Sequence, residues 1–518
     1  MSVVSGLLDK YGIKASLAQA DDFEKWLIER NWNLYNEDKM NNRVVIENEI
    51  KKLGIRFANG TVKKDYNAQI EVPFDLVCDM WIEGLEQTGL DWTVEDITKC
   101  ENKADSCAGT LQENGINSDN EQQDNPEVIC FCEDKNEKEN PKGDKCILKI
   151  FGKPIKSGDF TIKLCYKHYG WIEGEPISYI NIPIAFNPDP RSLWRNIPTP
   201  KKSLFYKPDA ECEYIKVEES EATGPRKDVV AASQRGRSHA QDGKARDDHF
   251  RIFHCDESDW YILAVADGAG SAKYSRQGSR IACDTVVEYC INKLKDSTKL
   301  EDAIRAYRTA DDEETSRKQM ANVIYSIVGN AAFSAHKTII DQAKQTANDI
   351  PGVTVKDFAT TLMFSICKKF DFGWFVASYW VGDGAMCIFN NEKGTFKLLG
   401  IPDEGEFSGQ TRFLTMPEVF IDGKAIMDRL RFSIEEDFTA LFLMTDGISD
   451  PMFETENNLN NINKWAEFWD KLKTGFPDDE ISGVDLKDDN EESKDQLLKW
   501  MDFWSPGNHD DRTLVILY

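Results

Sequence analysis

The chain has 518 residues, of which 41% are hydrophobic, and this length predicts two to four domains with sizeable cores. The formal net charge of −27 argues against binding a nucleic-acid backbone through the overall field, because like charges repel. No run of about 18 apolar residues occurs, so we expect no transmembrane helix. The N-terminal stretch lacks the basic and apolar regions of a signal peptide, and we expect a cytoplasmic protein.

The first 190 residues predict a helical segment followed by an all-β domain. Residues 1–55 carry Phe23, Trp26 and Leu27 at near-helical spacing. Residues 56–190 alternate apolar and polar positions between Gly- and Pro-containing turns, which favours an antiparallel sandwich. The stretches "GTVKKDYNAQI" and "GKPIKSGDFTIKL" resemble turn and strand motifs of bacterial immunoglobulin-like (cadherin-like) domains.

Two polar segments interrupt or follow this β-rich region. Residues 99–145 are rich in Asn, Asp, Glu and Lys and predict an acidic loop of the sandwich. Cys130 and Cys132 lie within it, and a zinc site that includes Cys100 and Cys107 is the alternative to free thiols. The absence of a second tight Cys or Cys/His pair favours free thiols. Residues 191–228 mix prolines with charges and predict a linker.

Acidic residues recur at the ends of predicted strands in residues 229–518. They are Asp248 in "GKARDDHF", Asp267 in "ILAVADGAG", Asp383 in "WVGDGAM", Asp446 in "LFLMTDGISD" and Asp510 in "NHDDRTLVILY". One Asp-Gly pair is most often only a turn. Several carboxylates that converge in a folded sheet repel one another unless a cation offsets their charge. Oxygen ligands favour Mg²⁺ or Mn²⁺, and two such ions suit the hydrolysis of a phosphate ester.

The order of these motifs resembles that of a known family. "VADGAG", "VGDG", "MTDGISD" and "DDRTLVIL" resemble the metal-dependent serine/threonine protein phosphatases, also called the protein phosphatase 2C or PPM family. "SQRGRSHAQDGKARDDHF" resembles its bacterial branch. The resemblance implies an α+β fold over residues 229–518, a four-layer α-β-β-α sandwich. It also implies that a metal-bound water attacks phosphoserine or phosphothreonine without a covalent enzyme intermediate.

The resemblance also assigns roles to individual residues. Asp267 resembles the aspartate that bridges two metal ions, and Gly268 the residue that offers its carbonyl to one of them. Asp446 and Asp510 resemble ligands of the first ion. Asp248 resembles the acidic residue beside the second ion, where it acts largely through bound water. Asp267 and Asp248 are therefore the expected catalytic residues.

Further positions depart from the family pattern or extend it. Asp383 resembles a residue that can hold a third, weaker metal ion. Asp511 replaces the usual asparagine, so Asp510 is the expected ligand of the pair.

The phosphate-binding residue of the family has no direct equivalent. Many members carry an arginine where this chain has Gly243. Among the nearby cations, which include Lys244 and Arg246, we prefer Arg237 or His239, and a turn or capping role for His239 is the alternative.

The segment between Asp446 and Asp510 is longer than a connection needs. Within this expected helical insertion, residues 451–505, Trp465, Phe468 and Trp469 lie at helical spacing. Such stripes predict helices that pack on the sandwich or on each other, and a lid beside the site is the alternative.

The sequence therefore predicts a phosphatase whose N-terminal domain recognises or tethers a phosphoprotein or a cognate kinase. Two other functions remain open. One is a catalytically inactive scaffold with a phosphatase fold, which binds phosphoproteins or a kinase partner. The other is a metal-dependent phosphoesterase that acts on small molecules.

Overall fold

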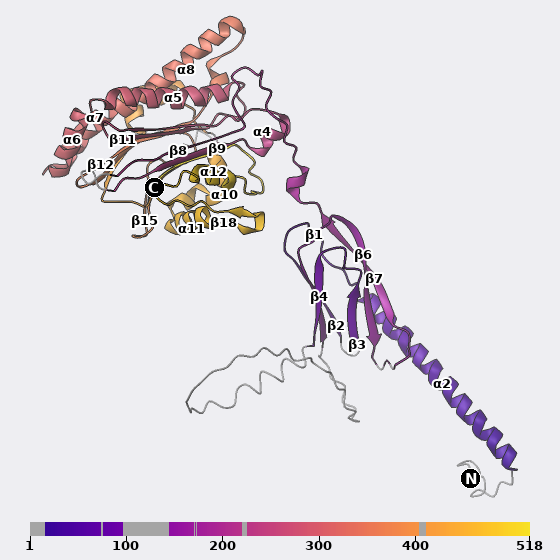
Figure 1. Cartoon of the computed structure of the whole chain (residues 1–518). Helices are drawn as coiled ribbons and strands as arrows, with labels where there is room; N and C mark the ends of the chain where they lie inside the picture. The colour runs from indigo at the N-terminus through magenta and orange to yellow at the C-terminus, as the bar shows by residue number, and fades with distance from the viewer. Residues whose placement is uncertain are drawn as a thin grey trace, which may run out of the picture. The chain divides into compact units, whose positions relative to one another are not determined.

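The computed structural model describes residues 16–73, 76–96, 145–169, 171, 173–219, 225–403 and 411–518. The acidic loop expected at residues 99–145, with the cysteines of the alternative zinc site, lies almost entirely outside these residues. The chain divides into two compact units, Met1–Leu193 and Trp194–Tyr518 (Figure 1). Within the described part, no helix combines the length and apolar character that a membrane span needs.

The first unit begins with a long helix and continues into two small sheets. Helix α2 spans Leu17–Lys52 and starts at a capping box formed by Ser16 and Gln19. The strands are β1 (Gly60–Thr61), β2 (Tyr66–Pro73), β3 (Val77–Glu83), β4 (Leu90–Asp96), β5 (Lys145–Gly152), β6 (Gly158–His168) and β7 (Ser178–Asn187). One sheet has the order β1-β7-β6-β3 and the other has the order β2-β5-β4.

The two sheets of this unit share one hydrophobic core. Leu148 and Ile150 of β5 belong to the same buried cluster as Ile162 of β6 and Ile182 of β7. Buried and more exposed positions alternate along β2 and β7, as one-sided burial of a sheet requires. Ile50, near the end of α2, joins this core and fastens the helix to it.

The second unit is built on two stacked antiparallel sheets. The five-stranded sheet contains β10 (His249–Cys255), β11 (Trp260–Ala266), β12 (Leu362–Phe370), β13 (Gly373–Val381) and β16 (Leu430–Glu435), in that order. The six-stranded sheet contains β15 (Thr395–Leu398), β14 (Ala385–Asn390), β17 (Ala440–Met444), β20 (Arg512–Leu517), β9 (Val229–Gln234) and β8 (Ala210–Ile215), in that order. A core that includes Val265 and Leu443 fills the space between the sheets.

Helices cover the outer face of each sheet, which completes four layers (Figure 1). On the five-stranded side they are α5 (Ser275–Leu294), α6 (Thr298–Thr309), α7 (Glu313–Ile324) and α8 (Asn330–Asp349), with a π-helical turn, η2 (Tyr325–Gly329), between the last two. On the six-stranded side they are α10 (Asp446–Phe453), α11 (Ile462–Thr474) and α12 (Ser493–Trp500). The short helices α4 (Arg237–Asp242) and α9 (Gly423–Met427) lie in connections. The arrangement is the α-β-β-α sandwich expected from the sequence.

One segment drawn from the sequence differs from the structure. The expected linker, residues 191–228, contains β8, which pairs with β9 along its whole length. The residues before β8 also pack on the second unit, and we call residues 194–209 the strap. The prolines and charges of this segment favour a linker when they are considered alone. The residues that it contacts lie far away in the sequence, so the sequence does not show them.

The expected insertion, residues 451–505, contributes a layer of the fold. Trp465 and Phe468 of α11, with Leu497 and Trp500 of α12, are buried in one core with residues of the six-stranded sheet. The helical stripes therefore pack on the sandwich, as the first interpretation of the sequence held, and the lid alternative has no support in this packing.

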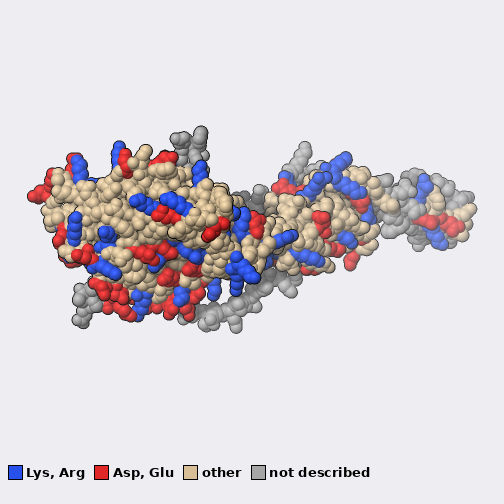
Figure 2. All heavy atoms as spheres, turned by 90° about the horizontal axis from the view of Figure 1, so that it is seen from above, with Lys and Arg blue, Asp and Glu red and all other residues tan. Residues whose placement is uncertain are grey.

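Charged side chains of both signs occur on the face of each unit that Figure 2 displays. The net charge of −27 is therefore not presented there as a uniformly acidic face.

Candidate metal centre

One edge of the stacked sheets collects the acidic residues of the second unit. They are Asp248 before β10, Asp267 after β11, Asp383 between β13 and β14, Asp446 after β17 and Asp510 before β20. Antiparallel pairing explains the convergence, because the end of one strand lies beside the start of its neighbour. Ala266 pairs with His249, for example, and this register sets Asp267 beside Asp248.

Three of these carboxylates form the centre of the cluster. Asp267, Asp383 and Asp446 are half-buried, and one oxygen of each lies within 4.8 Å of the others. Asp248 is fully buried, and its charge acts on the Asp267 side chain. Asp510 is close enough for its charge to act on both Asp267 and Asp446. The structure thus brings together all five carboxylates that the sequence singled out.

Hydroxyl groups fix the side chain of Asp248. Thr445, just before α10, and Thr513, in β20, each donate a hydrogen bond of 2.8 Å to its Oδ2. Its other oxygen, Oδ1, is buried and has no hydrogen-bond partner among the described residues. A buried oxygen of this kind is costly unless a hydrogen bond or a cation compensates it.

The Asp267-Gly268 turn is held by two neighbouring threonines. The Asp267 amide donates to Thr361 Oγ1 at 2.8 Å, and the Asp267 carbonyl accepts from the Thr361 amide and Thr360 Oγ1, both at 2.8 Å. A Cβ atom at position 268 would lie 2.7 Å from the carbonyl oxygen of Asp247. Only glycine permits this close approach, and the hydrogen bonds to Thr360 and Thr361 hold the turn in place.

Asp383 lies in the turn between β13 and β14. The preceding residue, Gly382, has a φ of +126°, which side-chain-bearing residues rarely adopt. Thr411 donates a hydrogen bond to Asp383 Oδ2, whereas Asp383 Oδ1 is buried without a partner among the described residues.

The cluster retains protons more strongly than isolated carboxyls do. Burial, and then the charge of Asp511, raises the pKa of Asp248 to about 7. Burial followed by repulsion from Asp446 raises the pKa of Asp267 well above its ordinary value. Burial followed by repulsion from Asp383 does the same for the pKa of Asp446. The raised pKa values indicate that the protein itself supplies too little positive charge for these carboxylates.

A divalent cation fits these observations. The buried Oδ1 atoms of Asp248 and Asp383 lack partners among the described residues, and the carboxylates repel one another. The donors at this edge are oxygen atoms, which suit Mg²⁺ or Mn²⁺ better than soft metals. The acidic cluster could therefore hold divalent ions, and they would replace the protons that the raised pKa values indicate.

His239 lies at the border of the cluster. Helix α4 sets its Nδ1 3.1 Å from Asp511 Oδ1 and its Nε2 3.8 Å from Asp247 Oδ2. Burial opposes a charge on this ring, but the hydrogen bond to Asp511 and the nearby carboxylates raise its pKa to about 9. The carboxylates around His239 thus favour its protonated form, and the ring lies beside Asp510.

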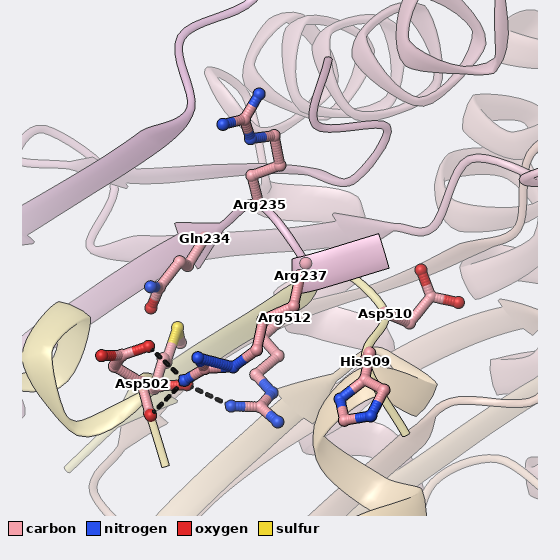
Figure 3. Close-up of a pocket in the computed structure, with 9 residues that line it drawn as sticks. Gln234, Arg235, Arg237, Asp502, His509, Asp510 and Arg512 are labelled. Atoms are coloured by element: carbon pink, nitrogen blue, oxygen red, sulfur yellow. Dashed lines mark hydrogen bonds and ion pairs between the residues drawn. The ribbon is translucent and has the colours of Figure 1, made fainter. Parts of the chain in front are cut away.

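Arg237, the other expected phosphate-binding residue, faces a different direction. Its guanidinium forms an ion pair of 2.6 Å with Asp502 and lies over the ring of Trp504. Figure 3 shows Arg237 pointing toward Asp502 and away from the carboxyl group of Asp510. The cavity that Arg237 lines has a volume of about 20 Å³, which is space for roughly one water molecule.

Some residues at this edge were not singled out as site residues from the sequence. Asp450 follows Asp446 by one turn of α10, and desolvation followed by repulsion from Asp383 raises its pKa to about 6. The i, i+4 spacing in "TDGISD" is the signal that could have identified it.

Asp511 is buried and accepts the amide protons of Gly236 at 2.6 Å and Asp247 at 2.5 Å, so it joins three loops of the site.

A family model described as protein phosphatase 2C matches residues 235–500, slightly more than half of the chain. The match includes four of the five converging carboxylates and ends before Asp510. A search of curated proteins found no match.

Solved structures returned by comparison include three phosphatases. A bacterial serine phosphatase is 12% identical, with 56% of this chain and 96% of that chain covered, at a TM-score of 0.32. Stp1 from Staphylococcus aureus is 12% identical, with 58% and 98% covered, at a TM-score of 0.31. The catalytic domain of PstP, in complex with two manganese ions, is 13% identical, with 60% and 98% covered, at a TM-score of 0.30. We base the assignment on the family model alone: the chain belongs to the protein phosphatase 2C family.

Proposed function

We propose that the chain is a metal-dependent protein phosphatase that hydrolyses phosphoserine or phosphothreonine. The observation that supports this best is the convergence of five carboxylates on one sheet edge, where two of them have buried oxygens without a hydrogen-bond partner among the described residues. Membership of the protein phosphatase 2C family indicates the class of reaction, and the five carboxylates provide a site at which it could occur.

The proposed ligands follow from this cluster. Asp267 would contribute to holding both ions, and the carbonyl of Gly268 would help to hold one of them. Asp446 and Asp510 would hold the first ion, and Asp248 would act beside the second. Asp383 would contribute to a third, weaker site. When bound, Mn²⁺ or Mg²⁺ would lower the pKa of a water molecule and offset negative charge on the phosphoryl oxygens.

The protein's own residues orient the reacting groups. Thr445 and Thr513 hold the side chain of Asp248, and Thr360 and Thr361 hold the turn that places Asp267 beside it. Fixed carboxylates of this kind reduce the reorganisation that the reaction needs.

We propose His239 as the cation that attracts the substrate phosphate. Its raised pKa and its position next to Asp510 support this role. Arg237 remains the second candidate, and it would first have to leave its ion pair with Asp502.

For the first unit we propose an immunoglobulin-like module that recognises or tethers a partner. Its two sheets around one core are compatible with such a module. The partner would be a phosphoprotein or a cognate kinase, in the cytoplasm of a bacterium.

Phosphate release from a phosphoserine or phosphothreonine peptide tests the proposed activity. The full chain should release phosphate with Mn²⁺ or Mg²⁺ and lose this activity with a chelator. Asp267→Asn should abolish it, whereas Asp341→Asn, at an exposed position of α8, should not. Turnover that survives both chelation and Asp267→Asn would disprove the mechanism. Phosphopeptide binding without turnover under either metal would favour the scaffold, and preferential turnover of small phosphate esters would favour the third function.

A further inference from the structure

The strap, residues 194–209, contacts several loops of the acidic edge. The Ile197 amide donates to the carbonyl of Ala240 in α4 at 2.9 Å. Thr199 Oγ1 accepts a hydrogen bond of 2.9 Å from Arg235 and lies 3.1 Å from the carbonyl of Lys244. These contacts attach the strap to the loop that leads to Asp248.

The next part of the strap is attached to helix α5. Arg276 donates to the carbonyls of Leu204 at 3.0 Å and Phe205 at 3.1 Å. The ring of Phe205 packs against the rings of Tyr274 and Phe358. Rotation of this part of the strap away from the site would therefore break both polar and aromatic contacts.

Lys207 carries the strap into the interior. Its side chain is fully buried, and its Nζ donates to the backbone carbonyl of Asp248 at 2.7 Å and to Ser279 Oγ at 3.2 Å. Ser279 Oγ in turn donates to the carbonyl of Asp247 at 2.5 Å. Two successive carbonyls of the Asp247-Asp248 pair are thus held from the same side.

The contacts of Asp248 divide into two sets. Lys207 holds its backbone, while Thr445 and Thr513 hold its side chain. Among the described residues, no carboxylate lies within ion-pair distance of the Lys207 ammonium group. Burial lowers the pKa of the Lys207 amine to about 7, so keeping this side chain in the interior is unfavourable, and its hydrogen bonds to Asp248 and Ser279 are the contacts that compensate it.

We propose that Lys207 is a positioning residue of the metal centre, so that the strap is part of the functional site. The proposal rests on the proposed function only in requiring that Asp248 faces a bound ion. Groups that orient metal ligands typically change metal affinity by about 10–100-fold when they are removed. Lys207→Met retains the length of the side chain and removes its donors.

The test compares Lys207→Met with Lys201→Met in the full chain. Lys201 belongs to the same strap but is exposed. Titration calorimetry with Mn²⁺ should give about a 10-fold weaker affinity for Lys207→Met and an unchanged affinity for Lys201→Met. Hydrogen exchange of the metal-free chain should become faster at residues 244–250 in Lys207→Met alone.

These two measurements separate the possible failures. Unchanged Mn²⁺ affinity and unchanged exchange in a folded Lys207→Met protein would overturn the positioning role, whatever the wild type does with phosphopeptides. If Lys207→Met binds Mn²⁺ more weakly than a wild type that itself lacks turnover, the positioning role is supported and the proposed activity is rejected. A wild type that binds no Mn²⁺ would reject both.

Ser279→Ala provides the second variant if Lys207→Met does not fold. It removes the hydroxyl that joins Lys207 to the carbonyl of Asp247 and leaves the ammonium group in place. We expect a change of the same sign and about threefold in Mn²⁺ affinity, smaller than that of a direct partner of Asp248. An affinity equal to that of the wild type would then contradict the proposal.

Discussion

Two acidic triads in the second unit satisfy the same distance criterion but differ in their surroundings. The edge triad is Asp267, Asp383 and Asp446, and the surface triad is Asp228, Asp488 and Asp489. In each, carboxylate oxygens lie within 4.8 Å of one another. In the surface triad, however, the buried member already has its partners: Asp228 accepts hydrogen bonds from the Val217 amide, the Asp489 amide and the Tyr214 hydroxyl.

The remaining members of the surface triad are exposed, and Lys216 lies 3.1 Å from Asp489. Water and this lysine can compensate their charges. In the part of the chain that the structure describes, the edge triad contains one buried oxygen without a hydrogen-bond partner, at Asp383, and lies beside another, at Asp248. The comparison shows that closeness of carboxylates is a poor indicator of a metal site, whereas buried and uncompensated oxygens are a better one.

The largest difference between the triads is expected in phosphopeptide turnover, when one carboxylate is removed from each. Asp446→Asn should lower phosphopeptide turnover more than about 100-fold, because loss of a direct ligand exceeds the 10–100-fold effect of groups that orient ligands. Asp488→Asn, in the surface triad, should leave turnover within about twofold, as expected for an exposed residue away from the site. Phosphate-release kinetics at saturating Mn²⁺ measure both. Equal losses in the two variants would remove the distinction between the triads.

The pH dependence of metal stabilisation should also separate the triads. The pKa of Asp248 is about 7 in the folded chain, above the ordinary value of 3.8. Its protonated form is therefore favoured by folding, and this stabilisation is fully present below about pH 4 and lost as pH rises through about 7. Mn²⁺ supplies the missing positive charge above that range and competes with protons below it.

Thermal unfolding with and without Mn²⁺ measures this effect. The increase in Tm caused by Mn²⁺ should be larger at about pH 8 than at about pH 5.5, because fewer protons then compete for the carboxylates. Asp488→Asn should retain this difference and Asp446→Asn should lose most of it. An increase that is the same at both pH values in the wild type would contradict the prediction.

The smallest effect is expected for a change inside the surface triad. Asp228→Asn replaces one of two oxygens that accept hydrogen bonds, and it should lower the free energy of unfolding by about 1–3 kcal/mol. Mn²⁺ affinity should not change. Urea unfolding of the metal-free chain provides the measurement, with Asp446→Asn as the contrasting variant. That variant should unfold no more easily than the wild type, because it relieves repulsion, and a clear loss of stability would indicate that Asp446 has a structural role.

The sequence was sufficient to locate the acidic edge. Asp267 and Asp446 each follow a buried apolar strand and precede glycine, and the structure sets both beside Asp383. Local periodicity also predicted α11 and its buried tryptophans. Such features depend on neighbours within a few residues, which the sequence displays directly.

Contacts between distant segments were not predictable in the same way. Lys207 lies among prolines and charges, and nothing near it in the sequence indicates a partner at Asp248, 41 residues later. The direction of Arg237 likewise depends on Asp502, 265 residues later. The strap was therefore interpreted as a linker, and Arg237 and His239 could not be separated until their partners were known.

The position of β20 has a consequence for biosynthesis. This strand lies between β17 and β9 in the six-stranded sheet, and Asp510 stands two residues before its first residue, Arg512. During synthesis β9 and β17 leave the ribosome well before β20. In the nascent chain the position between these two strands is therefore still empty. The edge triad can form on the nascent chain, but Asp510 arrives only with β20. We therefore expect that a nascent chain cannot assemble the complete set of carboxylates before residues 510–517 emerge, and that it exposes two unpaired strand edges until then.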